Sequence, residues 1–168
     1  QASVIETAEL VSPSVVTVAI TKQQRIMRMR PFMGMGFDPF GFFGGQGLQQ
    51  DTGKTEEIKQ DIGSGFVVDK DGLIVTNKHV VSDTDATYRI ITKDDKEYQV
   101  KKIYRDPIND LAILKVDATL PEIKLGDSDQ IKVGQFVIAI GTALGEFRHT
   151  VTTGVISGLG RGITAGDG

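Results

Sequence analysis

The chain has no cysteine, little net charge and no long apolar run. Without cysteine it can form no disulfide framework, no thiolate metal site and no cysteine nucleophile. No apolar stretch approaches the roughly 18 residues that a membrane-spanning helix needs. The formal net charge of -3 indicates neither a nucleic-acid partner nor a strongly charged one. What is left is the composition of an ordinary globular protein.

The composition favours β structure. At 168 residues the chain is long enough for one domain, or for a domain and part of a second. Its 20 glycines favour a turn-rich β architecture over a helical bundle. Because the first residue is Gln1 rather than methionine, we expect a processed or trimmed chain. An exported protein that has lost its signal peptide would look like this.

The N-terminal residues predict a helix followed by a strand. Ser3 and Glu6 form a Ser-x-x-Glu capping box, and apolar residues follow at near-helical spacing, so we expect a helix over residues 3–11. Pro13 ends this helix, because proline cannot continue one. Residues 14–21 are rich in β-branched side chains and predict the first strand.

Residues 22–62 show neither helical nor strand periodicity, and we interpret them as a long insertion loop. The interval holds all four methionines and five of the eight phenylalanines, namely Met27, Met29, Met33, Met35, Phe32, Phe37, Phe40, Phe42 and Phe43. Such adaptable apolar side chains suit contact with another subunit or a regulatory partner. Two alternatives stay open, which are a disordered segment and copper binding through the methionine thioethers.

From Gly63 onward the pattern is that of an all-β barrel or sandwich. Short β-rich segments alternate with turn signals, the clearest at Asp71-Gly72 and Asp94-Asp95. In chain order the segments are GFVVD, GLIVT, TYRIIT, EYQVKKIYR, LAILKV, EIKLG, GQFVIAIG and VTTGVISGL.

His79 and Asp110 are the candidate catalytic residues. His79 lies where a strand gives way to a turn, and histidine is the side chain best suited to act as a general base near neutral pH. The alternative for an isolated histidine is a core residue satisfied by hydrogen bonds. Asp110 begins an apolar strand, where an unpaired buried carboxylate would be costly. Taken alone, Asp110 is a turn cap, and Asp106 and Asn109 compete for that role.

Three sequence blocks, taken together, favour the catalytic interpretation. They are Gly63-Ser64-Gly65, Thr76-Asn77-Lys78-His79-Val80 and Asp110-Leu111-Ala112, in that order. With the leading SVVTVAI and the later LGDSDQIKVGQFVIAIG and TVTTGVIS, they resemble the HtrA (Deg-type) family of trypsin-like serine proteases. The resemblance runs nearly continuously over residues 63–162.

The resemblance implies an all-β fold, a trypsin-like double β-barrel with a short N-terminal helix. The first barrel would be complete and the second only begun. The chain then divides into four regions: a helix and first strand over 1–21, the insertion loop over 22–62, the remainder of the first barrel over 63–125, and the inter-barrel connection with the opening strands of the second barrel over 126–168.

The resemblance also implies the chemistry of a Ser-His-Asp triad. His79 would take the proton from a serine hydroxyl and later pass it to the leaving amine, while Asp110 would hold the imidazole in the productive tautomer. No cofactor and no metal site are implied. The Gly-Asn-Ser-Gly-Gly block that carries the family's nucleophile does not occur in these 168 residues. We therefore expect the nucleophile beyond Gly168 and expect this chain alone to be inactive.

Three other polar residues are set aside. Ser128 is followed by Asp129 where a nucleophile motif has glycine, and we expect it in a turn of the inter-barrel connection. Ser64 stands in Gly-Ser-Gly rather than Gly-x-Ser-x-Gly, and its glycines are expected to permit close approach of neighbouring backbone. His149 lies in a charged stretch and is interpreted as a surface residue.

The leading functional hypothesis is a serine endopeptidase of protein quality control, acting on unfolded or misfolded proteins. By resemblance it is extracytoplasmic and a homo-oligomer based on trimers. The C-terminal remainder of the protease would cover apolar faces that the opening strands of the second barrel leave exposed. The alternative is a non-catalytic, protease-like binding or chaperone module. A purely structural β-domain would leave the His79 and Asp110 motifs unexplained.

Overall fold

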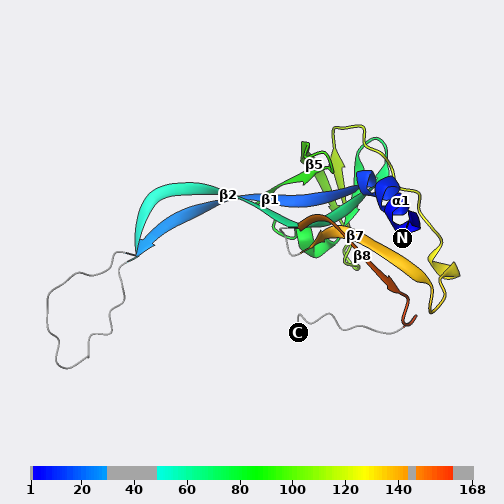
Figure 1. The fold of residues 1–168 in the computed structure, drawn as a ribbon. Coiled ribbons are helices and arrows are strands. Elements are labelled where there is room, and N and C mark those ends of the chain that lie inside the picture. Colours follow the sequence, from blue (N-terminus) through cyan, green and yellow to red (C-terminus); the bar gives the residue numbers. More distant parts are fainter. Residues whose placement is uncertain (1, 30–48, 144–146, 161–168) are drawn as a thin grey trace, which may run out of the picture.

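The computed structural model describes residues 2–29, 49–143 and 147–160. Within them one short helix precedes a closed β-barrel and a separate two-stranded sheet (Figure 1). The helix is α1 (Ala2–Val11), and a 3-10 turn (Ser12–Ser14) joins it to the barrel. The barrel strands are β1 (Val15–Met29), β2 (Gln49–Asp69), β3 (Leu73–Thr76), β4 (Thr87–Ile91), β5 (Glu97–Arg105) and β6 (Ala112–Val116). The second sheet consists of β7 (Phe136–Ala143) and β8 (Phe147–Val155).

The barrel is closed and antiparallel throughout. Its strand order is β1-β2-β3-β6-β5-β4, and β4 pairs back with β1 from Thr17↔Ile91 to Thr21↔Thr87. Closure leaves the barrel without a free edge, so its backbone donors and acceptors pair within the sheet. The expected all-β architecture, with a complete first barrel and a short N-terminal helix, is confirmed.

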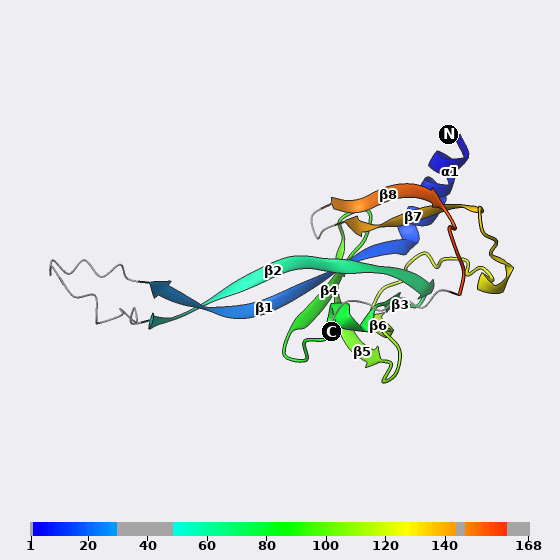
Figure 2. The same cartoon turned by 90° about the horizontal axis from the view of Figure 1, so that it is seen from below.

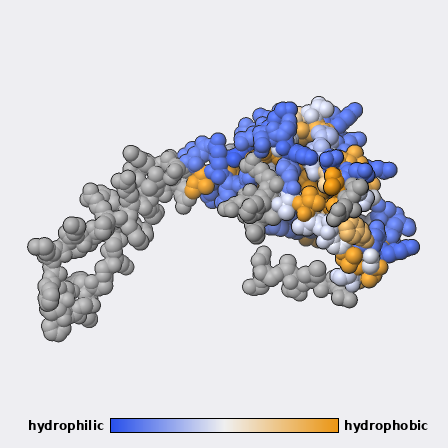
Figure 3. All heavy atoms as spheres, in the orientation of Figure 1, coloured by the Kyte–Doolittle hydropathy of each residue, from blue (hydrophilic) through white to orange (hydrophobic). Residues whose placement is uncertain are grey.

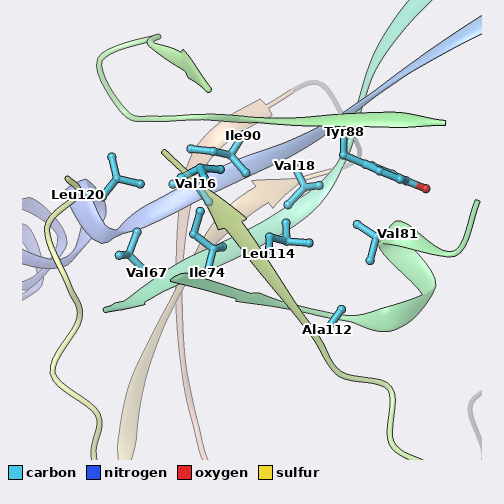
Figure 4. Packing of buried hydrophobic residues seen from close by; sticks show 11 residues of the cluster. Val16, Val18, Val67, Ile74, Val81, Tyr88, Ile90, Ala112, Leu114 and Leu120 are labelled. Atoms are coloured by element: carbon cyan, nitrogen blue, oxygen red, sulfur yellow. The ribbon is translucent and has the colours of Figure 1, made fainter. Parts of the chain in front are cut away.

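Alternate residues of each strand point into the barrel, as the period of two in a strand requires. β6 shows this most clearly, because Ala112, Leu114 and Val116 are buried while Ile113 between them is exposed. Figure 4 shows side chains from β1, β2, β3, β4 and β6 converging on one interior. The cluster comprises Val16, Val18, Val67, Ile74, Val81, Tyr88, Ile90, Ala112, Leu114, Val116 and Leu120. Burial of each large aliphatic side chain contributes about 1.5–3 kcal/mol before entropy is counted.

The two strongest turn signals are confirmed. Gly72 has a φ of +87°, in the left-handed region, and its N–H donates to the carbonyl of Asp69 at 3.0 Å. Asp95 has a φ of +58°, and the backbone N–H of Thr92 closes that turn on the carbonyl of Lys96 at 3.0 Å. Glycine and aspartate tolerate this backbone conformation better than other residues, which is why the turns were visible in the sequence.

The predicted helix is confirmed, but the predicted capping box of Ser3 and Glu6 does not form. The helix begins at Ala2, so Ser3 lies inside the first turn instead of preceding it. There its carbonyl accepts a 2.7 Å hydrogen bond from the hydroxyl of Thr7, one turn further on. A serine that serves as N-cap would instead stand outside the helix and accept from its backbone N–H groups.

Within the expected loop over residues 22–62, the described residues 22–29 and 49–62 belong to paired strands. β1 continues to Met29 and β2 begins at Gln49, and their register runs from Val15↔Phe66 to Met29↔Gln49. The distal part forms a two-stranded arm that projects from the barrel in both views (Figure 2). Strands that pair only with each other need no alternation of apolar and polar residues, so this arm carried no periodic signal. Met33, Met35 and the five phenylalanines of the insertion lie outside the described residues.

The second sheet lies beside the barrel and contacts α1, β1 and β2. β7 pairs antiparallel with β8 from Phe136↔Val155 to Ala143↔Phe147. Phe136, Val151 and Val155 are exposed, and Figure 3 shows hydrophobic residues at the surface over these strands.

The strand expected at 122–126 does not form. One backbone bond ties this segment down, from the N–H of Ile123 to the carbonyl of Val67 at 2.8 Å. Among the described residues, no helix is long and apolar enough to cross a membrane.

Candidate active site

β3 and β6 bring His79 and Asp110 to the same end of the barrel. The two strands are antiparallel neighbours, and the last residue of β3, Thr76, pairs with the first residue of β6, Ala112. Residues that follow β3 therefore meet residues that precede β6. After Thr76 the backbone stays extended at Asn77 and then enters a 3-10 turn, η2 (Lys78–Val81), which carries His79.

The two side chains contact each other directly. Nδ1 of His79 lies 2.6 Å from Oδ2 of Asp110, and the backbone N–H of His79 donates to Oδ1 at 2.9 Å. The amide of Asn77 adds a third bond, from Nδ2 to the backbone carbonyl of Asp110 at 3.1 Å. Because Asp110 takes Nδ1, Nε2 is the ring nitrogen left for a reacting group. The side chains of His79 and Asp110 are 70% and 48% exposed, so the pair is open to solvent.

Asp110 is held in its ionised form. The backbone N–H of His79, and after it the His79 ring, lower the pKa of the Asp110 carboxyl below its ordinary value, while desolvation opposes them. Hydrogen bonds that favour the charged form have this effect on a carboxyl. A carboxylate that accepts from both the backbone and the ring of one histidine fixes the orientation of that imidazole.

Two charged side chains, Lys78 and Arg105, form hydrogen bonds between the segment that carries His79 and the segment that carries Asp110. Nζ of Lys78, on the histidine side, donates to the backbone carbonyl of Asp106 at 3.0 Å. Nε of Arg105, on the aspartate side, donates back to the carbonyl of Val81 at 2.8 Å. The two segments are thus joined by two hydrogen bonds, one donated from each segment. Charged donors make such bonds stronger than neutral ones.

Asp106 organises the turn that precedes Asp110. Its Oδ1 accepts from the backbone N–H groups of Ile108 and Asn109, both at 2.7 Å, and its Oδ2 accepts from the side-chain amide of Asn109 at 3.2 Å. These bonds, led by the N–H of Asn109, lower the pKa of Asp106. The turn role therefore falls to Asp106 with Asn109, and Asp110 is left to contact His79.

A cavity of about 500 Å³ lies next to the segments that carry the pair. Asn77 and Leu111, the neighbours of the turn and of Asp110, line it together with residues of α1, β2 and β3. Ile138 and Ile140 of β7 line it from the second sheet. The partly apolar cavity therefore lies between the barrel and the second sheet, and it reaches the sequence neighbours of the pair but is not lined by His79 or Asp110.

The sequence prediction for Ser128 is confirmed. Ser128 begins a 3-10 turn (Ser128–Gln130) in the connection between the barrel and β7, and the side chain of Asp127 caps that turn by accepting from the N–H of Asp129 at 3.0 Å. Ser64 lies in β2, and its hydroxyl accepts the backbone N–H of Thr142 at 2.6 Å. Neither serine is placed as a nucleophile elbow.

The interpretation of His149 as a surface residue is wrong. The residue is half-buried, and both of its ring nitrogens are shielded from solvent. It lies in β8 where the pairing with β7 shifts register between Gly141 and Ala143, and its φ is +55°. A bulge of this kind re-aims a side chain, so neighbouring charged residues were a poor guide to its exposure.

The part of the chain that the structure describes contains no cluster of metal-binding side chains. No group of three or more histidine, aspartate or glutamate side chains there could hold a metal ion. The methionines for which copper binding was an alternative lie at positions whose side chains are outside this description.

The sequence matches the trypsin-like peptidase domain family over residues 63–168. The chain belongs to this family. A solved HtrA-type protease, AlgW in complex with a decapeptide, superimposes with a TM-score of 0.73 and 27% identity over 96% of this chain and 47% of that one. The similarity confirms the predicted HtrA type of trypsin-like serine protease.

Curated relatives agree with this assignment. A probable periplasmic serine endoprotease, DegP-like, of Pseudomonas fulva (strain 12-X) is 46% identical over 121 residues, which are 71% of this chain and 23% of that protein. A protein of the same description from Pseudomonas fluorescens is 38% identical over 165 residues, 92% of this chain and 34% of that protein. The HtrA-type chain thus spans about a quarter to a third of the length of these relatives.

The sequence did not predict the hydrogen bonds of Lys78 and Arg105 between the two segments, nor the cavity. Lys78 and Arg105 stand next to recognisable motifs, but their acceptors are backbone carbonyls, which leave no mark on the sequence. The pairing of β3 with β6 is the one signal that could have suggested these hydrogen bonds, because it brings the segment after β3 next to the segment before β6.

Proposed function

We propose that this chain supplies the histidine and aspartate of a Ser-His-Asp triad in a serine endopeptidase. The observation that carries the proposal is the double contact of Asp110 with His79, through Nδ1 at 2.6 Å and through the backbone N–H at 2.9 Å. This geometry orients the ring and leaves Nε2 for a reacting group. Membership of the trypsin-like peptidase family supports it independently.

In the proposed reaction, Nε2 of His79 removes the proton of a serine hydroxyl as that oxygen attacks the peptide carbonyl. The same nitrogen then gives the proton to the leaving amine. Asp110 does not take up the proton; its carboxylate stabilises the imidazolium and keeps Nδ1–H directed toward itself. The lowered pKa of Asp110 supports this role, because the carboxylate stays charged throughout the neutral range.

The serine of the proposed triad comes from residues outside these 168, so the chain on its own is inactive. The open second sheet supports this part of the proposal. β7 and β8 form only a two-stranded sheet, on which Phe136, Val151 and Val155 are exposed. A following segment that completed the second barrel would cover these side chains and bring a hydroxyl to the cavity beside Asn77 and Leu111.

The substrates and setting we propose are those of a quality-control protease. Unfolded or misfolded proteins expose extended, apolar chain, which a partly apolar cavity next to the segments that carry the catalytic pair would accommodate. Relatives described as periplasmic support an extracytoplasmic location. We further propose a homo-oligomer based on trimers, and no cofactor is required by the triad chemistry.

A serine-reactive fluorophosphonate probe tests the proposal. In the HtrA-type protein that carries these residues together with the rest of the protease domain, the wild type should be labelled and His79→Ala should not. Asp110→Asn should be labelled far more slowly, whereas Asp117→Asn, at the opposite end of β6, should match the wild type. The isolated chain of 168 residues should stay unlabelled. A folded wild-type protein that is not labelled would instead indicate a non-catalytic binding module.

A further inference from the structure

Ser64 joins the closed barrel to the second sheet through its side chain. Its hydroxyl oxygen, on β2, accepts a 2.6 Å hydrogen bond from the backbone N–H of Thr142 on β7. The hydroxyl of Thr142 lies 2.6 Å from the hydroxyl of Thr17 on β1, and Thr17 is fully buried. Hydroxyl and amide groups thus form a short polar chain between the barrel and β7.

Glycines make this contact possible. A Cβ on Gly141 would lie 2.9 Å from Oγ of Ser64, closer than real Cβ contacts come. On the barrel side, a Cβ on Gly65 would lie 2.9 Å from Cγ2 of Ile74 and 3.0 Å from the carbonyl oxygen of Val75. The expected close approach of neighbouring backbone is therefore confirmed at Gly65, whereas at Gly63 the nearest atoms belong to the side chain of Val80. A Cβ on Gly141 would therefore crowd the Ser64 contact itself, whereas a Cβ on Gly65 would crowd β3.

The same serine also holds the strand end that leads to His79. Its backbone carbonyl accepts a 2.7 Å hydrogen bond from the hydroxyl of Thr76. Thr76 is the last residue of β3 and is buried, and the turn that carries His79 begins two positions later, at Lys78. Through its side chain Ser64 therefore holds β7, and through its backbone it holds the end of β3.

We propose that Ser64 is a positioning residue that fixes where the second sheet meets the His79–Asp110 pair. In a protease built from two barrels, catalysis requires the pair on one barrel to face groups that the other presents, and displacements of about 1 Å cost large factors in rate. Ser64 bonds to β7 through its side chain and to the end of β3 through its backbone. It touches no reacting atom. The catalytic consequence rests on the proposed function, but the contact itself does not.

Hydrogen exchange in the full chain tests the contact. Ser64→Ala removes the acceptor of the Thr142 N–H, so that amide should exchange about tenfold faster, the factor expected from one lost hydrogen bond. The amide of Ile123, which donates to the carbonyl of Val67, should keep its rate. Ser82→Ala, at an exposed serine, is the matched control. An unchanged Thr142 amide in Ser64→Ala would overturn the proposal.

A double-variant cycle tests the close approach. Gly141→Ala should accelerate exchange of the Thr142 amide in the wild type, because the new Cβ pushes against Oγ of Ser64. In the Ser64→Ala background that oxygen is gone, so Gly141→Ala should add little, and the two effects should be strongly non-additive. Gly154→Ala, in the same sheet but with open space around its Cβ, should change nothing. Additive effects would contradict the proposed contact.

Activity tests the positioning role in the protein that carries the rest of the protease domain. Ser64→Ala should lower the rate of fluorophosphonate labelling per folded molecule by about tenfold, and Gly141→Ala should do the same. A merely structural role would lower the folded fraction and leave the rate per folded molecule unchanged, which would overturn the positioning role. An unlabelled wild type would overturn the proposed function and this role together, while the exchange data would still decide whether the contact exists.

Discussion

Replacing Gly72 by alanine should destabilise the barrel by about 2–5 kcal/mol. Its φ of +87° lies in the left-handed region, where an L-residue with a Cβ pays about 1–2 kcal/mol. The new Cβ would also lie 2.5 Å from the carbonyl oxygen of Val116 and 2.8 Å from that of Ala118. Forcing atoms into such a crowded place adds about 1–3 kcal/mol. The sum is a large part of the roughly 5–15 kcal/mol that stabilises an ordinary domain.

Gly134→Ala separates the two contributions. Gly134 has nearly the same φ, +86°, but nothing lies within 4 Å of the position its Cβ would take. It should therefore lose only the backbone part, about 1–2 kcal/mol. Urea unfolding of both variants and the wild type gives the losses from the midpoints, provided that the slopes agree. Equal losses in the two variants would refute the contact of Gly72 with the end of β6.

Three further results are expected. The ion pair with Lys96 and a hydrogen bond from the hydroxyl of Thr92 lower the pKa of Asp94 to about 2. The ionised carboxylate therefore stabilises the folded state above about pH 4, and this contribution is lost as the pH falls toward 2. Asp94→Asn should flatten the acid unfolding curve over that interval. Leu114→Ala, at a fully buried position, should cost about 2–5 kcal/mol in urea unfolding, while Leu125→Ala, at an exposed one, should stay within about 0.5 kcal/mol. Arg105→Met should cost about 1–3 kcal/mol in the same assay, because the carbonyl it serves is left without its charged donor.

The strands between residues 63 and 116 could be predicted because two local signals coincide there. Alternating apolar residues mark the strands, and the turns at Asp71-Gly72 and Asp94-Asp95 contain the residues that tolerate a positive φ. The His79 and Asp110 motifs were recognised in the sequence through the family resemblance, and the structure places them at neighbouring ends of the paired strands β3 and β6. The family resemblance alone indicated a catalytic role, because the local sequence favoured a core role for His79 and a turn role for Asp110.

The features that escaped prediction depend on contacts between distant segments. The β1–β2 arm carries no alternating pattern, because it has no core to face. His149 lies at a register shift between β7 and β8 and its ring nitrogens are shielded from solvent, although its own neighbours in sequence are charged. The contacts of Ser64 and Arg105 end on the backbone of residues far along the chain, so no motif records them.

In the proposed triad, Asp110 fixes one tautomer of the His79 imidazole, with Nδ1 protonated and Nε2 free to accept a proton. Nitrogen NMR of the His79 ring in this chain measures it directly, at a pH where the ring is neutral. We expect an Nδ1–H tautomer with its proton shifted far downfield, and loss of that signal in Asp110→Asn but not in Asp117→Asn. A neutral ring protonated at Nε2, or a spectrum that Asp110→Asn leaves unchanged, would contradict it.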